Sequence, residues 1–164
     1  MTTPSDGSVV VRRLGPPTRV EIDQLTATFD RYRAHYGESE DRSRATAWLE
    51  ENLTAGRLEA FVADAGGEFI GLALAMVVPA SLSLGHFWQI RDLFVLPSHR
   101  RLGVGGALLA SVRAAAISAG AARLSLQTEA DNTSALRLYS KSGYSPVEGY
   151  QSLVLPLIPD ASER

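Results

Sequence analysis

The chain has 164 residues, 45% of them hydrophobic and 21% charged, which is the balance of one globular domain. Its 16 Lys and Arg against 18 Asp and Glu leave a net charge of −2, which gives no general attraction to nucleic acid or to an anionic membrane. No cysteine is present and the three histidines show no metal-ligand spacing, so we expect no disulfide, cysteine nucleophile or metal site. No apolar run approaches about 18 residues, and the polar N-terminus is unlike a signal peptide. We therefore expect a cytoplasmic enzyme or binding domain.

Hydrophobic periodicity and turn residues predict a series of strands and helices. In chain order we expect a flexible tail at 1–7, a strand at 9–11, helices at 20–36 and 43–53, strands at 58–62, 69–78 and 87–96, a helix at 104–119, a strand at 124–128, a helix at 132–142, a strand at 150–155 and a flexible tail at 157–164. No repeat, low-complexity segment or linker interrupts the series. We therefore expect a single domain over residues 1–164, of α/β (α+β) class with a mixed sheet.

A glycine-rich loop follows the predicted strand at 87–96. It reads Arg100, Arg101, Leu102, Gly103, Val104, Gly105, Gly106 and leads directly into a helix. Glycines let the backbone turn tightly and approach a ligand without a Cβ in the way. The first N–H groups of a helix have no internal partner and attract anions, and the two arginines add positive charge. The loop predicts a pyrophosphate site, with an unoccupied strand-to-helix turn as the alternative.

Two common nucleotide motifs fit this loop poorly. A Walker loop requires Gly, four residues and then Gly-Lys-Ser/Thr, a string that the chain does not contain. The dinucleotide fingerprint requires a third Gly or Ala where this chain has Leu108. That fingerprint also follows the first strand of its unit, whereas this loop begins at residue 100 of 164. A nucleotide-binding module is therefore a weaker interpretation.

Three segments together resemble the GNAT superfamily of N-acetyltransferases. The loop matches the family pattern Arg/Gln-x-x-Gly-x-Gly/Ala, and Asp92-Leu-Phe-Val-Leu-Pro97 resembles the family's central strand. Downstream, the segment from Asn132 to Tyr144 resembles the block Asn-x-x-Ala-x-x-Leu-Tyr followed by a Gly-aromatic pair. A finer similarity, of Phe29–Gly37 and of Trp88-x-x-x-Asp-Leu-Phe-Val, is to the branch that contains yeast histone and other protein acetyltransferases. The resemblance implies a GNAT fold, a central mixed and mostly antiparallel sheet flanked by about four helices.

The resemblance also implies acetyl-coenzyme A as the acetyl donor. In the family, the central strand pairs its backbone with the pantetheine arm and the loop holds the pyrophosphate. The matching residues here are Leu93, Phe94 and Val95 on the strand, Arg100 to Gly106 in the loop, and Asn132 and Tyr139 on the last helix. A backbone N–H near Val95 is expected to polarise the acetyl carbonyl.

Tyr139 is the expected general acid for the departing thiolate. It lies seven positions, about two helical turns, after Asn132, so the two share one face of the predicted helix. The family places that face along the cofactor. The alternative is an ordinary core aromatic next to Ala135 and Leu136.

The identity of the base is more open. A lysine-like amine has a pKa of about 10.4, so its deprotonation at neutral pH needs a base or a water chain. Some family members use a glutamate at a position of the central strand that is Arg91 here, and Asp92 is the next candidate. A structural ion pair of Asp92 and an ordered water acting as the base are the alternatives.

Four residues are expected to contact the acceptor. Tyr32, His35 and Tyr36 end the first helix, which borders the acceptor groove in the family, and Glu129 follows the strand at 124–128. Core packing and a solvated loop carboxylate are the alternatives. We expect the acceptor to be a primary amine of a small molecule, amino acid, antibiotic or protein, and the sequence does not choose among them. Other interpretations are transfer of a longer acyl group and a non-catalytic acyl-coenzyme A sensor. Dimers are common among the relatives, so a homodimer is one expectation, and neither nucleic acid nor membrane is an expected partner.

Overall fold

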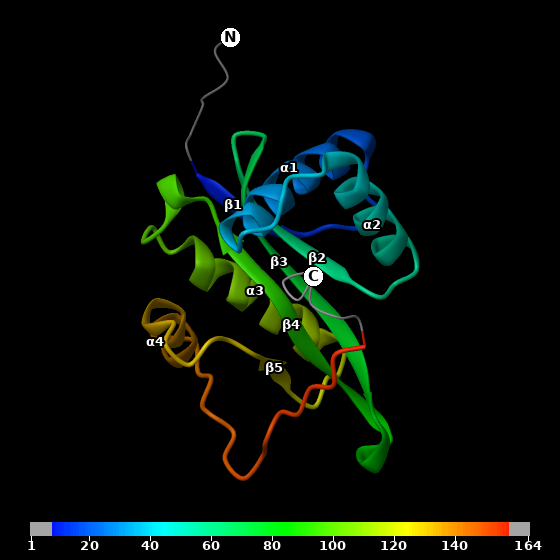
Figure 1. Ribbon diagram of the computed structural model, residues 1–164, viewed down its shortest axis with the longest axis vertical. Helices are drawn as coiled ribbons and strands as arrows, with labels where there is room; N and C mark the ends of the chain where they lie inside the picture. The colour runs from blue at the N-terminus through cyan, green and yellow to red at the C-terminus, as the bar shows by residue number, and fades with distance from the viewer. Residues whose placement is uncertain (1–7, 158–164) are drawn as a thin grey trace.

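The computed structural model describes residues 8–157, which are built around a five-stranded sheet with the order β1-β2-β3-β4-β5 (Figure 1). The strands are β1 (Val9–Arg13), β2 (Glu59–Ala65), β3 (Glu68–Ala80), β4 (Gly85–Val95) and β5 (Leu124–Leu126). β1 to β4 pair antiparallel in chain order, and β5 pairs parallel to β4. The sheet is therefore mixed and mostly antiparallel, as the sequence predicted. The expected tails at 1–7 and 157–164 lie outside the described residues, except for Leu157.

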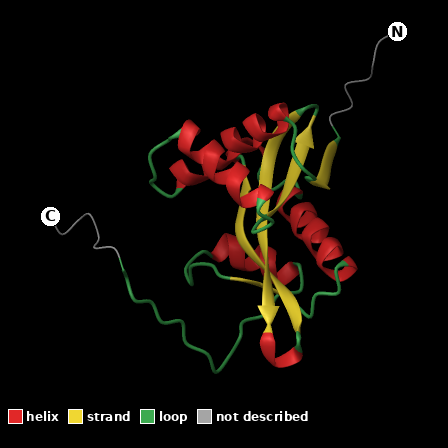
Figure 2. Cartoon of the chain, turned by 90° about the vertical axis from the view of Figure 1, so that its right-hand side faces the viewer, coloured by secondary structure: helices red, strands yellow, loops and turns green. Residues whose placement is uncertain are grey.

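Four α-helices surround the sheet. They are α1 (Arg19–His35), α2 (Arg42–Thr54), α3 (Val104–Ser118) and α4 (Thr133–Lys141). α1 and α2 cover one face and α3 covers the other (Figure 2). α1 begins with a capping box, in which the Thr18 side chain accepts from the Glu21 N–H and the Glu21 carboxylate accepts from the Thr18 N–H. In the described part of the chain, no helix is both long and apolar enough to span a membrane.

The core lies between the sheet and its two helical layers. Its fully buried side chains come from α1, α2, α3 and the three central strands, and include Leu25, Leu49, Phe61, Leu72, Leu74, Trp88 and Leu108. Burial of such side chains stabilises the fold by about 1.5–3 kcal/mol each. The same packing fixes α1 and α3 relative to β4, which carries the predicted site residues Asp92 to Val95.

A β-bulge interrupts β4 at Arg91. Leu74 of β3 lies opposite Asp92, but the next residue, Ala75, lies opposite Ile90. Arg91 is therefore the extra residue that has no partner on β3. Side chains in a regular strand alternate between the two faces, so one inserted residue reverses the alternation after it.

The bulge turns Asp92 toward α1. Ile90 lies on the same face of the sheet as Gly71. A Cβ added to Gly71 would lie 3.3 Å from the Leu108 side chain, so α3 covers this face. In an uninterrupted strand, Asp92 would share that face. Its carboxylate instead accepts a hydrogen bond from the Tyr32 hydroxyl of α1.

β4 and β5 are neighbours along only part of β4. The paired positions are Trp88 with Leu124, Gln89 with Ser125 and Ile90 with Leu126. β4 then continues to Val95, and no described strand pairs with it on that side (Figure 1). The backbone of residues 91–95 is consequently an open sheet edge, directly before the glycine-rich loop.

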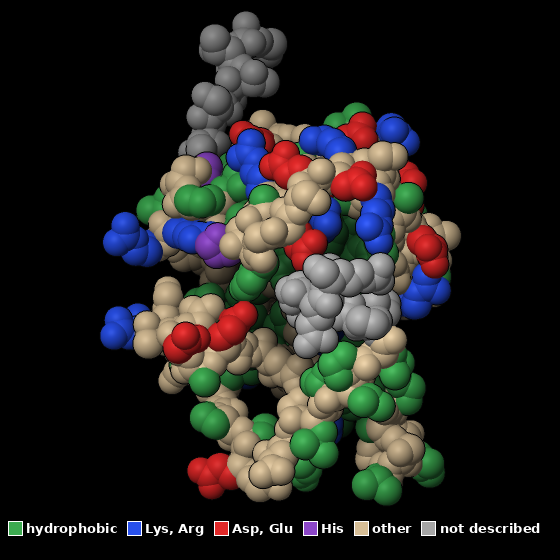
Figure 3. Space-filling model, viewed as in Figure 1, with side chains coloured by type: hydrophobic (Ala, Val, Ile, Leu, Met, Phe, Trp, Pro, Cys, Tyr) green, Lys and Arg blue, Asp and Glu red, His purple; other side chains and the backbone are tan. Residues whose placement is uncertain are grey.

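The prediction of a last strand at 150–155 is wrong for this structure. The segment has no regular structure, and its apolar side chains are exposed, with Tyr150 at 83% and Leu153 at 88%. Apolar alternation favours a strand only where a partner strand is present, and none of the described strands pairs with this segment. Exposed apolar side chains gather at the lower end of the molecule in Figure 3. Leu82 and Leu84, in the turn between β3 and β4, are also exposed.

Candidate functional site

The glycine-rich loop connects β4 to α3 through a short 3₁₀ turn, η2 (Pro97–His99). Arg101 (φ 62°) and Gly103 (φ 83°) both have left-handed backbone conformations. Such a conformation is strained for arginine and is found where a structure holds a loop in one shape. Gly103 is the N-cap of α3 and supplies no side-chain cap, so the first N–H groups of α3 have no side-chain partner. The loop therefore has the free donors that the predicted anion site requires.

The residues at the start of α3 differ in the space around them. Val104 is buried, so it can offer a ligand only its backbone. A Cβ on Gly105 would lie 3.1 Å from Leu138 of α4, which explains why this position is glycine. A Cβ on Gly106 would meet nothing within 4 Å. Gly105 permits the packing of α4 on α3, whereas Gly106 leaves the surface of the first turn open.

The two arginines of the loop have different surroundings. The Arg100 Nε donates to the Val95 carbonyl oxygen at 3.0 Å, and its guanidinium lies 5.6 Å from the centre of the Phe94 ring. Arg100 therefore ties the loop to the end of β4, with the rest of its guanidinium exposed. Arg101 is exposed and makes no side-chain hydrogen bond to the described residues. Both leave positive charge beside the free N–H groups.

Asp92 is a half-buried carboxylate in this region. The Tyr32 hydroxyl donates to its Oδ1 at 2.7 Å. Burial raises the pKa of Asp92, while the Tyr32 hydrogen bond and the positive charge of Arg91 lower it in part. Within the described residues no Lys, Arg or His lies close enough to form an ion pair with it. The structural ion pair considered from the sequence is therefore absent there.

Tyrosines from two helices surround the same region. Tyr139 on α4 is half-buried, and its ring centre lies 6.0 Å from that of Tyr144 in an edge-on arrangement. Burial raises the pKa of Tyr139, and the charges of Tyr36 and Glu129 raise it further. The pKa of Tyr36 is also raised, by burial and by the charges of Glu129 and Asp92. α1, β4, α4 and the loop before α4 thus bring their ionisable groups into one region.

Three predicted site residues have internal contacts that their sequence positions alone did not indicate. The Asn132 side chain accepts from the Ala135 N–H at 3.1 Å, so its oxygen caps α4. Tyr32, expected beside the acceptor, is held against Asp92. His35 packs against Phe94, with 6.0 Å between ring centres.

Sequence reasoning missed one member of this region and one contact. Tyr144 was noted only as part of a motif, yet its hydroxyl is buried and has no hydrogen-bond partner among the described residues. The Tyr32–Asp92 contact was also missed. The two residues are 60 positions apart and meet only because of the bulge, so no local pattern signals their contact.

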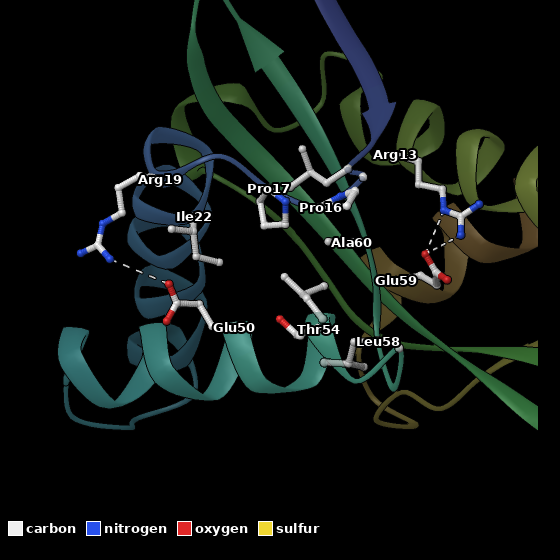
Figure 4. A pocket seen from close by; sticks show the side chains of 14 residues that line it. Arg13, Pro16, Pro17, Arg19, Ile22, Glu50, Thr54, Leu58, Glu59 and Ala60 are labelled. Carbon is white, nitrogen blue, oxygen red and sulfur yellow. Dashed lines mark hydrogen bonds and ion pairs between the residues drawn. The ribbon is translucent and has the colours of Figure 1, made fainter.

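A pocket of about 930 Å³ lies elsewhere, between the start of α1, the end of α2 and the start of β2 (Figure 4). Its charged side chains neutralise one another, since Arg13 pairs with Glu59 at 2.7 Å and Arg19 with Glu50 at 3.9 Å. None of the predicted site residues lines it. The candidate site is instead the open edge of β4 with the adjoining loop.

Comparison with known proteins decides the family. The model of the acetyltransferase (GNAT) family matches residues 23–144, which include the bulge, the loop and α4. The chain belongs to the GNAT acetyltransferase family. A relative from Bacillus subtilis (strain 168), named as an uncharacterized N-acetyltransferase YhfO, is 35% identical over 126 residues, covering 77% of this chain and 85% of the relative. The protein is accordingly an enzyme of the N-acetyltransferase class.

Solved structures agree with this membership. The crystal structure of a probable acetyltransferase superposes with a TM-score of 0.82 at 25% identity, covering 93% of this chain and 99% of the other. An aminoglycoside acetyltransferase from an uncultured soil metagenomic sample, solved with trehalose, superposes with a TM-score of 0.79 over 94% of this chain and 100% of its own. Its identity is 18%, so it supports the fold alone. GNAT acetyltransferases generally use acetyl-coenzyme A, and the free N–H groups and arginines of this loop fit a pyrophosphate.

Proposed function

We propose that this GNAT acetyltransferase moves an acetyl group directly from acetyl-coenzyme A to a primary amine. The observation that carries the proposal is the open edge of β4, residues 91–95, leading into a loop whose helix-terminal N–H groups are free. A pyrophosphate suits those N–H groups and the charge of Arg100 and Arg101. A pantetheine arm, which carries amides, suits an unpaired strand edge. The residues that would hold the donor are those predicted from the sequence, with Asn132 also serving as a helix cap.

The acceptor end of the site favours a cationic amine. Asp92 and Glu129 supply negative charge, and the hydroxyls of Tyr36 and Tyr139 supply hydrogen-bonding groups. An ammonium group is stabilised beside carboxylates and must lose a proton before it reacts. The proposal therefore includes a cationic amine of a small molecule or peptide as the acceptor.

The proposed reaction is a single transfer with no acyl-enzyme. Asp92 takes a proton from the acceptor ammonium, and the neutral nitrogen attacks the thioester carbonyl. The C–S bond then breaks, and Tyr139 gives its proton to the departing thiolate. The nitrogen loses its second proton to solvent as the amide forms, and a proton from solvent restores the Tyr139 hydroxyl. A tyrosine hydroxyl is protonated at neutral pH, as a general acid must be, and burial raises the pKa of Tyr139 further. The chain has no cysteine, in agreement with direct transfer.

The test is release of coenzyme A thiol over a panel of amines. The panel contains a diamine, an aminoglycoside, free amino acids and a lysine peptide, and mass spectrometry of the product confirms gain of one acetyl group. We expect turnover with at least one cationic amine and little with a neutral amide. Propionyl- and longer acyl-coenzyme A donors distinguish a transferase of longer acyl groups. Tight binding of acetyl-coenzyme A with no thiol release over the full panel would indicate a sensor instead.

A further inference from the structure

The contact between Tyr32 and Asp92 has a consequence beyond the proposed acid and base. We infer that Tyr32 is a positioning residue, whose hydroxyl holds the Asp92 carboxylate ionised and oriented at the acceptor side of the site. The inference rests on the proposed function, in which Asp92 takes the proton of the amine. It assigns to Tyr32 a role that acts through Asp92, in place of the acceptor contact expected from the sequence.

Packing fixes the hydroxyl before any substrate binds. The Tyr32 ring lies among three aromatic rings, with centre-to-centre distances of 5.9 Å to Phe29, 5.2 Å to Tyr36 and 5.8 Å to Phe94. A ring held on several sides loses little further freedom when its hydroxyl forms a hydrogen bond. The bulge at Arg91 supplies the other half of the contact, because it turns Asp92 toward α1.

The surroundings of Asp92 make this one hydrogen bond important. The groups that face it are Tyr32 and Tyr36 from α1 and Arg91 from its own strand, and Tyr36 also experiences the charges of Glu129 and Arg100. Tyr32 is the only one of these that forms a hydrogen bond with the carboxylate. A buried carboxylate without an ion-pair partner tends to take up a proton, and a donor to its charged form opposes that tendency. A protonated Asp92 could not serve as a base.

A purely structural role accounts for the ring but not for the hydroxyl. Phenylalanine would fill the same space among Phe29, Tyr36 and Phe94. Placing a hydroxyl and a carboxylate in a mostly buried position costs desolvation free energy, which an apolar pair would not cost. Such locally unfavourable choices are typical of sites retained for chemistry.

The experiment compares the parent with Tyr32→Phe and with Tyr150→Phe, a control that removes a tyrosine hydroxyl from a side chain that is 83% exposed. The Asp92 carboxyl carbon is titrated by ¹³C NMR, with Asp92→Asn used to assign its signal. The pH dependence of kcat/KM is measured in parallel. The NMR spectra also report whether each variant is folded.

We expect the titration of Asp92 to move to higher pH by about one unit in Tyr32→Phe, since a hydrogen bond to a charged group has that size. The acidic limb of the pH profile of kcat/KM should move by the same amount. Tyr150→Phe should change neither the Asp92 titration nor this profile. An unmoved Asp92 titration would overturn the inference, as would a moved titration with an unmoved rate profile. If the parent releases no thiol, the proposed function fails. The NMR titration separates this outcome from a failure of the inference about Tyr32, because it measures the effect of Tyr32 on Asp92 without any turnover.

Discussion

At the scale of single residues, Asp92 combines burial with the lack of an ion-pair partner among the described residues. Its raised pKa means that the folded protein binds the proton of Asp92 more tightly than the unfolded chain does. This contribution to stability is fully present below the unfolded-state pKa, taken as 3.8, and is lost as the pH rises through the folded-state pKa. At neutral pH the ionised Asp92 therefore destabilises the fold.

Replacement of Asp92 by asparagine should accordingly raise stability and lower activity. The amide oxygen can still accept from Tyr32, while the buried charge is removed. We expect a higher melting temperature than the parent at pH 7, a gain that disappears as the pH approaches 3.8, and a fall in kcat of roughly 10²-fold. Thermal melts across pH and steady-state kinetics measure both. Glu40→Gln removes an exposed carboxylate as a control. A lower melting temperature for Asp92→Asn with parental kcat would mean that Asp92 is structural.

Tyr139 can be tested by removing its hydroxyl alone. Tyr139→Phe retains the ring, so binding of acetyl-coenzyme A should change little while kcat falls by roughly 10²-fold or more. A donor with a more acidic thiol should recover part of the loss, because its thiolate needs the proton less. Tyr144→Phe is the matched control, since its hydroxyl has no described partner and lies on the neighbouring ring. Equal kcat for Tyr139→Phe and the parent, with chemistry rate-limiting, would leave water as the proton donor.

At the scale of elements, the start of α3 places a glycine with open space around it, Gly106, beside a crowded one, Gly105. Gly105 packs within reach of Leu138, so a side chain there would displace α4 and confuse loss of binding with loss of structure. Gly106 occupies the third position of α3 and has free space around it. It is therefore the better position for testing the anion site.

Gly106→Glu should abolish donor binding without unfolding the protein. A carboxylate in the first turn of a helix stabilises it by about 0.3–1 kcal/mol, yet the same charge repels a pyrophosphate and competes for the free N–H groups. We expect the dissociation constant for acetyl-coenzyme A to rise by roughly tenfold or more, equivalent to about 1.4 kcal/mol. Gly106→Gln, a neutral side chain of the same shape, should retain most of the affinity. Calorimetric titration gives both constants, and equal affinities for the two variants would place the anion elsewhere.

The sequence predicted the positions of the four helices and of the strands β1 to β5 well, because these depend on local signals. The mostly antiparallel sheet was expected from the family resemblance and is confirmed. Asn132 shows a limit of that prediction, since the sequence placed it at the start of the last helix but did not indicate that its side chain caps α4. The direction of Asp92 could not be predicted. A bulge depends on which residues lie opposite across the sheet, and Ile90-Arg91-Asp92 reads as an ordinary stretch of strand. The absence of the predicted strand at 150–155 has a related cause. The alternation of apolar residues is a property of the segment alone and does not show whether a neighbouring strand is available to pair with it.

At the scale of the whole molecule, binding of the donor should be visible as stabilisation. A ligand that binds only the folded state raises the free energy of unfolding by about 2.7 kcal/mol at a concentration of 100 times its dissociation constant. Acetyl-coenzyme A should therefore raise the melting temperature in a concentration-dependent way, whereas ATP and NAD should not. A comparable rise with ATP or NAD would favour the nucleotide-binding interpretation of the loop.

The bulge at Arg91 also bears on how this chain can change. One added residue in a strand moves the side chains that follow it to the opposite face of the sheet. The number of residues before Asp92, and not their chemistry, therefore decides which helical layer Asp92 faces. The Arg91 side chain is exposed, so its replacement should disturb little packing, although it would remove a positive charge that lowers the pKa of Asp92. Deletion of residue 91 is a different matter. It would shorten β4 by one residue and move the side chains of residues 92–95 to the opposite faces of the sheet. The fold should thus tolerate substitution at position 91 far better than deletion of that residue.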